Sequence, residues 1–182
     1  MSEEADRKAQ LKKVIKEGGK RGVEIEGAAD LGGLKFFCTA VEEPAGDLDM
    51  LVESVNAMNA ESDPSQEERK GGSGHIGKMI FSAGAEQLGV LAYVPEEYQK
   101  ELSSEEWLKK VLDLFGGEIA DVTPTIAKGK VMTDGNKNIF PLKIREPMIL
   151  EANNFLRKKG LFPEDDGDDD DEMVFGDDDF PS

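Results

Sequence analysis

The sequence predicts an α/β (α+β) fold, in which helices pack on a mixed sheet and a disordered acidic tail follows. Apolar residues at helical spacing alternate along the chain with short apolar runs typical of buried strands. The 182 residues, 38% of them hydrophobic, suffice for one modest core. From Glu164 to Asp179 there are 11 acidic residues and no Lys or Arg. From Glu164 onward the chain therefore has too few apolar residues to fold.

The N-terminal part predicts a helix over residues 3–17, with Leu11, Val14 and Ile15 as a short apolar stripe. The run Gly18-Gly19-Lys20-Arg21-Gly22 is expected to break that helix, and a short strand is expected at residues 23–26. We therefore assign residues 1–22 to an N-terminal helix with a basic linker and residues 23–163 to the α/β domain.

The first half of that domain begins with a nearly continuous apolar run at residues 34–41, which predicts a strand buried on both faces. Asp47 is a suitable N-cap for the next helix. Its apolar face is expected to contain Leu48, Leu51, Val52, Val55 and Met58. A polar loop at residues 60–77 then leads to two strands, 78–83 and 88–94, joined by a turn.

The second half predicts a helix whose capping box is Ser103 with Glu106, and which ends at Gly116-Gly117. Trp107 lies at the core spacing of this helix, so packing is favoured over base stacking. Short strands are expected at 118–122, 126–133 and 139–144. Pro147 suits the first turn of a closing helix, which Gly160 would end. Residues 164–182 form the acidic tail.

The formal net charge is -17, and without the 11 tail carboxylates it falls to -17 + 11 = -6. An acidic surface repels phosphate, so a nucleic-acid contact needs a local basic patch. The candidate residues form two clusters: Arg69, Lys70, His75 and Lys78, and then Lys128 and Lys130. A second interpretation of Lys128 and Lys130 has equal weight, because basic residues on an edge strand also prevent sheets from pairing with one another.

The run from Gly72 to Met79 resembles a phosphate loop, since Gly72, Gly77 and Lys78 match its spacing. Met79 replaces the hydroxyl residue that would ligate magnesium, and a strand follows where a helix is needed. We therefore expect a flexible connection, with a non-catalytic anion site as the alternative. No catalytic residue, cofactor or metal site is expected.

The remaining composition favours a cytoplasmic protein that contacts no membrane. No stretch approaches the ~18 consecutive apolar residues of a membrane span. The first residues do not have the pattern of a secretory signal. The single cysteine, Cys38, lies in an apolar run and is expected to be a buried structural thiol.

The acidic tail contains an apolar group that could anchor it to a partner. The candidate residues are Asp170, Asp171, Met173, Val174, Phe175 and Phe180. We expect charge to steer this segment onto a basic, grooved protein and the apolar side chains to fill a pocket. The alternative is a tail that only increases solubility.

Three stretches follow the element order of one known family. They are Gly33-Leu34-Lys35-Phe36-Phe37 with Asp49-Met50-Leu51, then residues 78–83 with 88–94, then residues 104–108 through to Phe115-Gly116-Gly117. Here the chain resembles the C-terminal DHHA1-type domain of alanyl-tRNA synthetases. The family's second helix is followed by a glycine-rich, basic signature that contacts tRNA. This chain has Glu118-Ile119-Ala120-Asp121 instead.

The resemblance implies a free-standing, non-catalytic relative, because 182 residues leave no room for aminoacylation and editing modules. The first functional hypothesis is a translation-associated binding module that contacts tRNA or ribosomal RNA through its folded body. The alternative is a protein–protein adaptor or structural subunit whose acidic tail binds a basic partner. The oligomeric state is left open.

Overall fold

The computed structural model describes residues 3–60 and 71–161. Arg69 and Lys70 lie outside the described residues, and so do all the candidate residues of the acidic tail.

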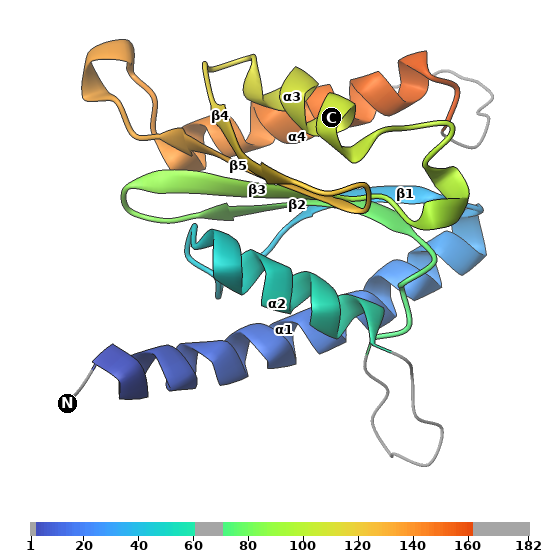
Figure 1. The fold of residues 1–182 in the computed structure, drawn as a ribbon, viewed down its shortest axis with the longest axis horizontal. Helices are drawn as coiled ribbons and strands as arrows, with labels where there is room; N and C mark the ends of the chain where they lie inside the picture. Colours follow the sequence, from blue (N-terminus) through green and yellow to red (C-terminus); the bar gives the residue numbers. More distant parts are fainter. Residues whose placement is uncertain (1–2, 61–70, 162–182) are drawn as a thin grey trace, which may run out of the picture.

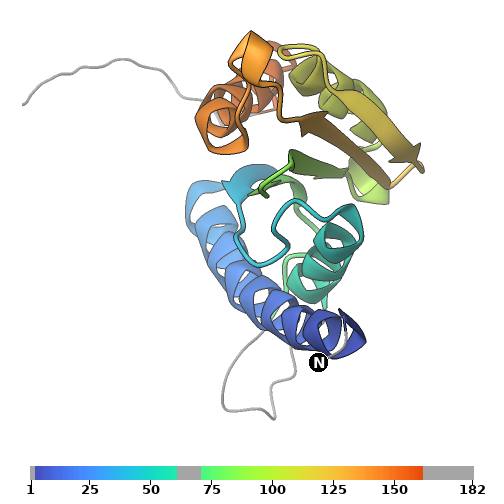
Figure 2. The same ribbon diagram turned by 90° about the vertical axis from the view of Figure 1, so that its left-hand side faces the viewer.

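The molecule has three layers, with a five-stranded sheet between two pairs of helices (Figures 1 and 2). The strands are β1 (Phe36–Ala40), β2 (Gly77–Ala83), β3 (Gln87–Tyr93), β4 (Glu118–Val122) and β5 (Ile126–Met132). They lie in the order β1-β2-β3-β5-β4, and β1 is parallel to β2 while the other pairs are antiparallel. The predicted mixed sheet with packed helices is confirmed.

Helices α1 (Glu3–Gly32) and α2 (Leu48–Asn59) lie on one face of the sheet, and α3 (Ser104–Leu112) and α4 (Pro141–Lys158) lie on the other. Two short 3-10 helices, η1 (Glu96–Tyr98) and η2 (Gly135–Lys137), occur in the connections. No helix in the described ranges combines the length and apolar character that crossing a bilayer requires.

The hydrophobic core has two parts because alternate residues of the central strands point to opposite faces. On the α3/α4 face, Trp107 is fully buried, and its indole N–H donates to the carbonyl oxygen of Ala152 at 3.2 Å. On the α1/α2 face, Ile25 packs in a cluster with Ile80 and Leu91. Packing of Trp107, as the sequence predicts, is confirmed.

The predicted start signals of two helices are confirmed. The Asp47 carboxylate accepts hydrogen bonds from the backbone N–H groups of Asp49 and Met50 at the start of α2. The Ser103 hydroxyl accepts one from the N–H of Glu106 at the start of α3. Strand β1 is less buried than expected, since it is an edge strand in which only Phe36 is fully covered.

Helix α1 runs without interruption from Glu3 to Gly32, so the predicted break at residues 18–22 and the strand at 23–26 are wrong. The glycines there face α2. A Cβ on Gly18 would lie 2.6 Å from the carbonyl oxygen of Ser54, and one on Gly22 would lie 2.6 Å from that of Met58. Close helix packing therefore offsets the poor helix propensity of glycine.

The last predicted strand, 139–144, is also wrong. Ile139 forms only an isolated bridge with Asp134, and α4 begins at Pro141. Proline is favoured at this first helical position, where its missing N–H costs nothing. Pro147 lies inside α4 instead of in its first turn, and it is exposed, so water can reach the backbone group that it leaves unpaired.

Candidate nucleic-acid interface

Lys78, a predicted phosphate contact, is fully buried at the start of β2. Its ammonium donates to Asn59 Oδ1 at 2.6 Å and to the carbonyl oxygen of Ser73 at 2.9 Å, and it lies 4.7 Å from the centre of the Tyr93 ring. Burial lowers the pKa of Lys78 to about 7. In this conformation Lys78 ties the chain before β2 to the end of α2, and its charge does not reach the surface.

The other described candidates lie apart or among carboxylates. Lys128 Nζ is 4.0 Å from a carboxylate oxygen of Asp121. Lys130, also on β5, lines an open cleft of about 560 Å³ whose wall includes Asp47, Asp49 and Glu86. His75 is exposed in the segment before β2. Together with the buried Lys78, these residues do not form one exposed basic surface.

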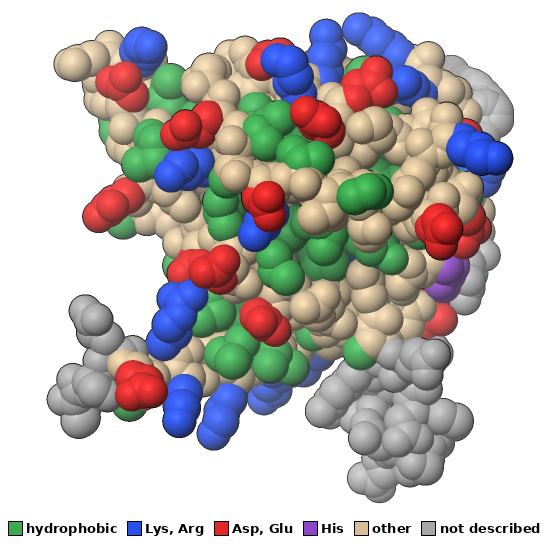
Figure 3. All heavy atoms as spheres, viewed as in Figure 1, with side chains coloured by type: hydrophobic (Ala, Val, Ile, Leu, Met, Phe, Trp, Pro, Cys, Tyr) green, Lys and Arg blue, Asp and Glu red, His purple; other side chains and the backbone are tan. Residues whose placement is uncertain are grey.

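A different set of basic residues lies together on α1. Between Arg7 and Arg21 the sequence has seven Lys or Arg and one acidic residue, Glu17. Five of the seven are exposed lysines, which we call the lysine face: Lys8, Lys12, Lys13, Lys16 and Lys20. Lys or Arg side chains project from the lower rim of the molecule in Figure 3, where α1 runs in Figure 1.

The lysine face follows the geometry of the helix. Lys8, Lys12, Lys16 and Lys20 are spaced four residues apart, which places neighbours on adjacent turns of one face. Lys13 flanks this row. The structure shows no ion pair between any of the five and a carboxylate of the described residues. Their positive charge is therefore available to an external anion.

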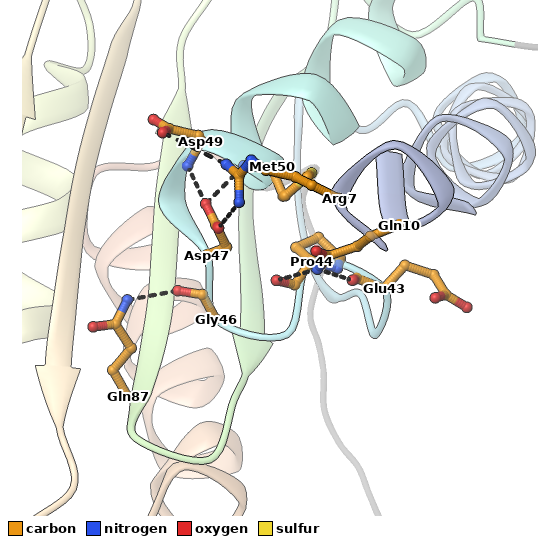
Figure 4. A network of polar contacts seen from close by, with 9 residues as sticks. All are labelled: Arg7, Gln10, Glu43, Pro44, Gly46, Asp47, Asp49, Met50 and Gln87. Atoms are coloured by element: carbon orange, nitrogen blue, oxygen red, sulfur yellow. Dashed lines mark hydrogen bonds and ion pairs between the residues drawn. The ribbon is translucent and has the colours of Figure 1, made fainter. Parts of the chain in front are cut away.

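The opposite flank of α1 is fixed by the loop before α2 (Figure 4). Arg7 Nη1 lies 2.9 Å from Asp47 Oδ2, and Gln10 Nε2 donates to the carbonyl oxygens of Glu43 and Pro44 at 3.0 and 3.3 Å. Three polar contacts on this flank hold α1 in one rotation about its axis. These contacts fix the direction in which the lysine face points.

Glu17, the acidic residue of this stretch, is also bound by the loop. Its carboxylate accepts the backbone N–H groups of Glu42 at 2.8 Å and Glu43 at 3.1 Å. A hollow of about 410 Å³ beside it is lined by Lys13, Lys16 and Lys20 together with Glu17 and Glu43. These two hydrogen bonds stabilise the carboxylate of Glu17, which is the one acidic residue within the basic stretch of α1.

The loop is in turn anchored to the β2–β3 hairpin. Gln87 Nε2 donates to the carbonyl oxygen of Gly46 at 2.7 Å (Figure 4). The N–H of Gly46 in turn donates to Ser82 Oγ at 3.1 Å. Gly46 has a φ of 83°, and a Cβ there would lie 2.7 Å from the carbonyl oxygen of Gln87, so only glycine fits. The orientation of α1 is therefore coupled to the sheet.

Asp47 connects the two helices electrostatically. Burial raises the pKa of its carboxyl group. The hydrogen bonds from Arg7 and from the N–H groups of Met50 and Asp49 lower this pKa by more than burial raises it, so the net pKa lies below the usual value. The same carboxylate thus caps α2 and pairs with α1. Among the described residues, no group of three or more His, Cys, Asp or Glu side chains is placed to hold a metal ion.

The lysine face was not predicted from the sequence, although the signal for most of it was available. Lys8, Lys12 and Lys16 have a four-residue spacing inside the predicted helix at residues 3–17. The predicted end of that helix at residue 17 assigned only Lys20 to a linker. The continuity of α1 through Gly18 and Gly19 adds Lys20 to the row.

No known family model matches the sequence, and no curated protein matches it. Among solved structures, the C-Ala domain of alanyl-tRNA synthetase from Aquifex aeolicus is similar with a TM-score of 0.37 and 13% identity, covering 66% of this chain and 94% of that one. The catalytic domain of the histidine kinase ThkA has a TM-score of 0.22 and 17% identity, covering 71% and 96%. Neither likeness assigns an activity or a partner to this chain.

Proposed function

We propose that this chain is a non-catalytic binding module that contacts the phosphate backbone of RNA through the lysine face of α1. The observation that supports the proposal is five exposed lysines, without ion pairs to the described residues, on one helix whose rotation is fixed. Because each lysine carries its own positive charge, a chain of phosphates can be bound by several of them at once.

The composition of the lysine face favours a nucleic acid over a protein partner. Protein–protein interfaces are depleted in lysine and depend on aromatic, methionine and arginine anchors. On the basic stretch of α1, Ile15 is the one large hydrophobic side chain among the described residues with more than a third of its surface exposed, at 46%. The sequence resemblance to the DHHA1-type domain makes RNA the expected nucleic acid.

The expected binding is electrostatic and therefore sensitive to salt. Each lysine that neutralises a phosphate releases condensed counterions, so the logarithm of the affinity falls with the logarithm of the salt concentration, with a slope of about -0.7 to -0.9 per contact. Five contacts predict a slope of about -4. The proposal thus specifies a steep salt dependence in addition to binding itself.

The test measures the fluorescence anisotropy of labelled tRNA titrated with the full chain at 50 to 200 mM salt. Lys12→Gln/Lys16→Gln removes two charges from the lysine face, and we expect about fivefold to tenfold weaker binding and a slope smaller by about 2. The matched control is Lys109→Gln/Lys110→Gln, which removes two exposed lysines from α3 and should leave binding within about twofold.

Three results would overturn the proposal. The first is no binding of tRNA at 50 mM salt, and the second is equal weakening by the α1 and α3 variants. The third is tight, α1-dependent binding to vesicles containing anionic lipid without binding to tRNA. A translation-associated role and the adaptor role of the acidic tail stay predictions from the sequence.

A further inference from the structure

We infer that the RNA bound by the lysine face is double-helical and is held through its phosphates without reading of its bases. This inference rests on the proposed function and names the class of RNA that the same surface takes. Three observations support it. Helix α1 has no aromatic residue, the two arginines of its basic stretch are engaged within the protein, and the lysine row extends along the helix.

Helix α1 has no aromatic residue with which an unpaired base could stack. Its sequence from Glu3 to Gly32 contains no Phe, Tyr or Trp. Single-stranded nucleic acids are bound by combining a basic groove with aromatic side chains, each worth about 1–3 kcal/mol per stacked base. A single strand on α1 would gain the phosphate contacts but would lose this stacking contribution.

The aromatic residues of the described chain belong to other elements. They are Phe36, Phe37, Phe81, Tyr93, Tyr98, Trp107, Phe115, Phe140 and Phe155. The most exposed phenylalanine among them, Phe140 at 42%, precedes α4, on the opposite face of the sheet from α1 (Figure 2). On the α1 side of the sheet, Phe37 and Tyr93 are partly buried and pack against the cluster that contains Ile25, so no exposed aromatic side chain lies there among the described residues.

The two arginines of the basic stretch are engaged within the protein. Arg7 pairs with Asp47 at 2.9 Å, and its other terminal nitrogen is 3.8 Å from Asp49. Arg21 Nη1 lies 3.1 Å from Glu24 Oε1. The planar fork of arginine suits bidentate recognition, whereas lysine acts on phosphate as a point charge. The major groove of an RNA double helix is in addition too deep and narrow for side chains to read the base edges. The lysine face can therefore position a nucleic acid but has little means of reading its sequence.

The row of lysines extends far enough along α1 to contact several phosphates. A four-residue step along an α-helix rises about 6 Å and turns by about 40°, so Lys20 lies about 18 Å along the helix axis from Lys8. Double-stranded DNA carries one charge per about 1.7 Å of axis when both strands are counted, against about 3.4 Å per strand, and an RNA double helix likewise presents the phosphates of two strands. Over the same length, a duplex thus offers about twice as many phosphates as one of its strands.

The experiment compares a labelled 20-base-pair RNA duplex with each of its two strands, using the full chain at 50 mM salt. We expect the duplex to bind at least about tenfold more tightly than either strand. A second duplex of scrambled sequence should bind within about twofold of the first. Lys12→Gln/Lys16→Gln should weaken duplex binding, and Lys13→Gln/Lys20→Gln, an independent pair on the same face, should do the same.

The outcomes separate this inference from the proposed function. Single strands that bind as tightly as the duplex, with the same dependence on the α1 lysines, would overturn the duplex inference and leave the RNA proposal standing. A more than tenfold preference for one duplex sequence would overturn the claim that the bases are not read. Failure of every RNA to bind would overturn both.

Discussion

At the residue scale, Lys78 illustrates how a basic residue can have a structural role in place of a binding role. Its ammonium is fully buried, and it is satisfied by an amide oxygen, a carbonyl oxygen and the face of an aromatic ring. No carboxylate of the described residues forms an ion pair with it. Taking a cation out of water favours the neutral amine, which is why the pKa is lowered to about 7.

This lowered pKa predicts a specific dependence of stability on pH. The usual lysine pKa is 10.5, so between pH 7 and 10.5 the unfolded chain holds a proton that the folded chain releases. The free energy of unfolding should therefore rise with pH in this window, by at most about 1.4 kcal/mol per unit. Urea unfolding of wild type and Lys78→Met between pH 6.5 and 9.5 tests this, because the methionine variant should lack the rise.

Lys110→Met, which replaces an exposed lysine of α3, is the control and should follow the wild-type profile. A difference between wild type and Lys78→Met that stays constant with pH would show that the buried amine does not change its protonation.

Asp47 provides a second prediction at this scale, since one carboxylate caps α2 and pairs with Arg7. Asp47→Ala should lower the free energy of unfolding by about 1–2 kcal/mol through loss of the cap. Asp47→Asn keeps an acceptor for the N–H groups of α2 and loses only a half-exposed ion pair, so it should cost less than about 1 kcal/mol. Thermal unfolding of both variants at pH 7 compares the two contributions. Equal losses would mean that the ion pair, and not the cap, is the main contribution.

At the scale of elements, the packing of α1 on α2 depends on glycines where larger side chains would collide with backbone. Gly22 is the closest case, because a Cβ there would lie 2.6 Å from the carbonyl oxygen of Met58 and 2.9 Å from the Cα of Gly71. Backbone atoms cannot move aside as the end of a long side chain can. The two helices would therefore have to separate to admit even one methyl group.

Gly22→Ala should accordingly destabilise the protein by about 1–3 kcal/mol, the usual cost of overpacking. Gly27→Ala in the same helix is the matched control, since a Cβ there meets nothing within 4 Å. Alanine is the better helix former, so this control should stabilise by up to about 1 kcal/mol. Urea unfolding gives both values, and two variants that change stability in the same direction would contradict the close packing of α1 on α2.

The same contrast explains how much of the fold could be predicted from the sequence. Helices α2 and α3 and strands β2 and β3 follow from local signals, namely the Asp47 and Ser103 caps and the apolar patterns after them. The continuity of α1 depends on contacts of Gly18 and Gly22 with residues of α2 that are distant in sequence. Local helix propensity treats those glycines only as destabilising to the helix, so the helix was predicted to end too early.

The candidate site was predicted less well than the fold, for two physical reasons. A basic residue can bind an external anion only if it is exposed and unpaired. The sequence around Lys78 and Lys128 does not indicate that the first is buried and the second lies near a carboxylate. The row on α1 has the spacing of one helix face already in the sequence, but that its lysines are exposed and form no ion pair with the described residues is known only from the structure. The charge composition indicated that binding a nucleic acid needs a local basic patch, and the fold determines where such a patch can lie.

At the scale of the whole molecule, the charge is divided between regions of opposite sign. The basic stretch of α1 has seven positive residues and one negative, whereas residues 164–182 contain 11 acidic residues and no Lys or Arg. Both regions belong to one chain, so a contact between the acidic segment and the lysine face would be intramolecular. Its carboxylates are natural competitors for the lysines that would bind phosphate.

Deletion of residues 164–182 should therefore strengthen RNA binding, because it removes 11 negative charges and changes the net charge from -17 to -17 + 11 = -6. We expect an increase of about threefold or more at 50 mM salt, which should shrink at 500 mM, where charges are screened within a few ångströms. Anisotropy with a labelled RNA duplex measures both values. A full-length variant with all 11 acidic residues changed to Asn or Gln separates charge from chain length and should match the deletion. If that variant binds like wild type while the deletion binds more tightly, the segment acts by occupying space, and competition by charge is excluded.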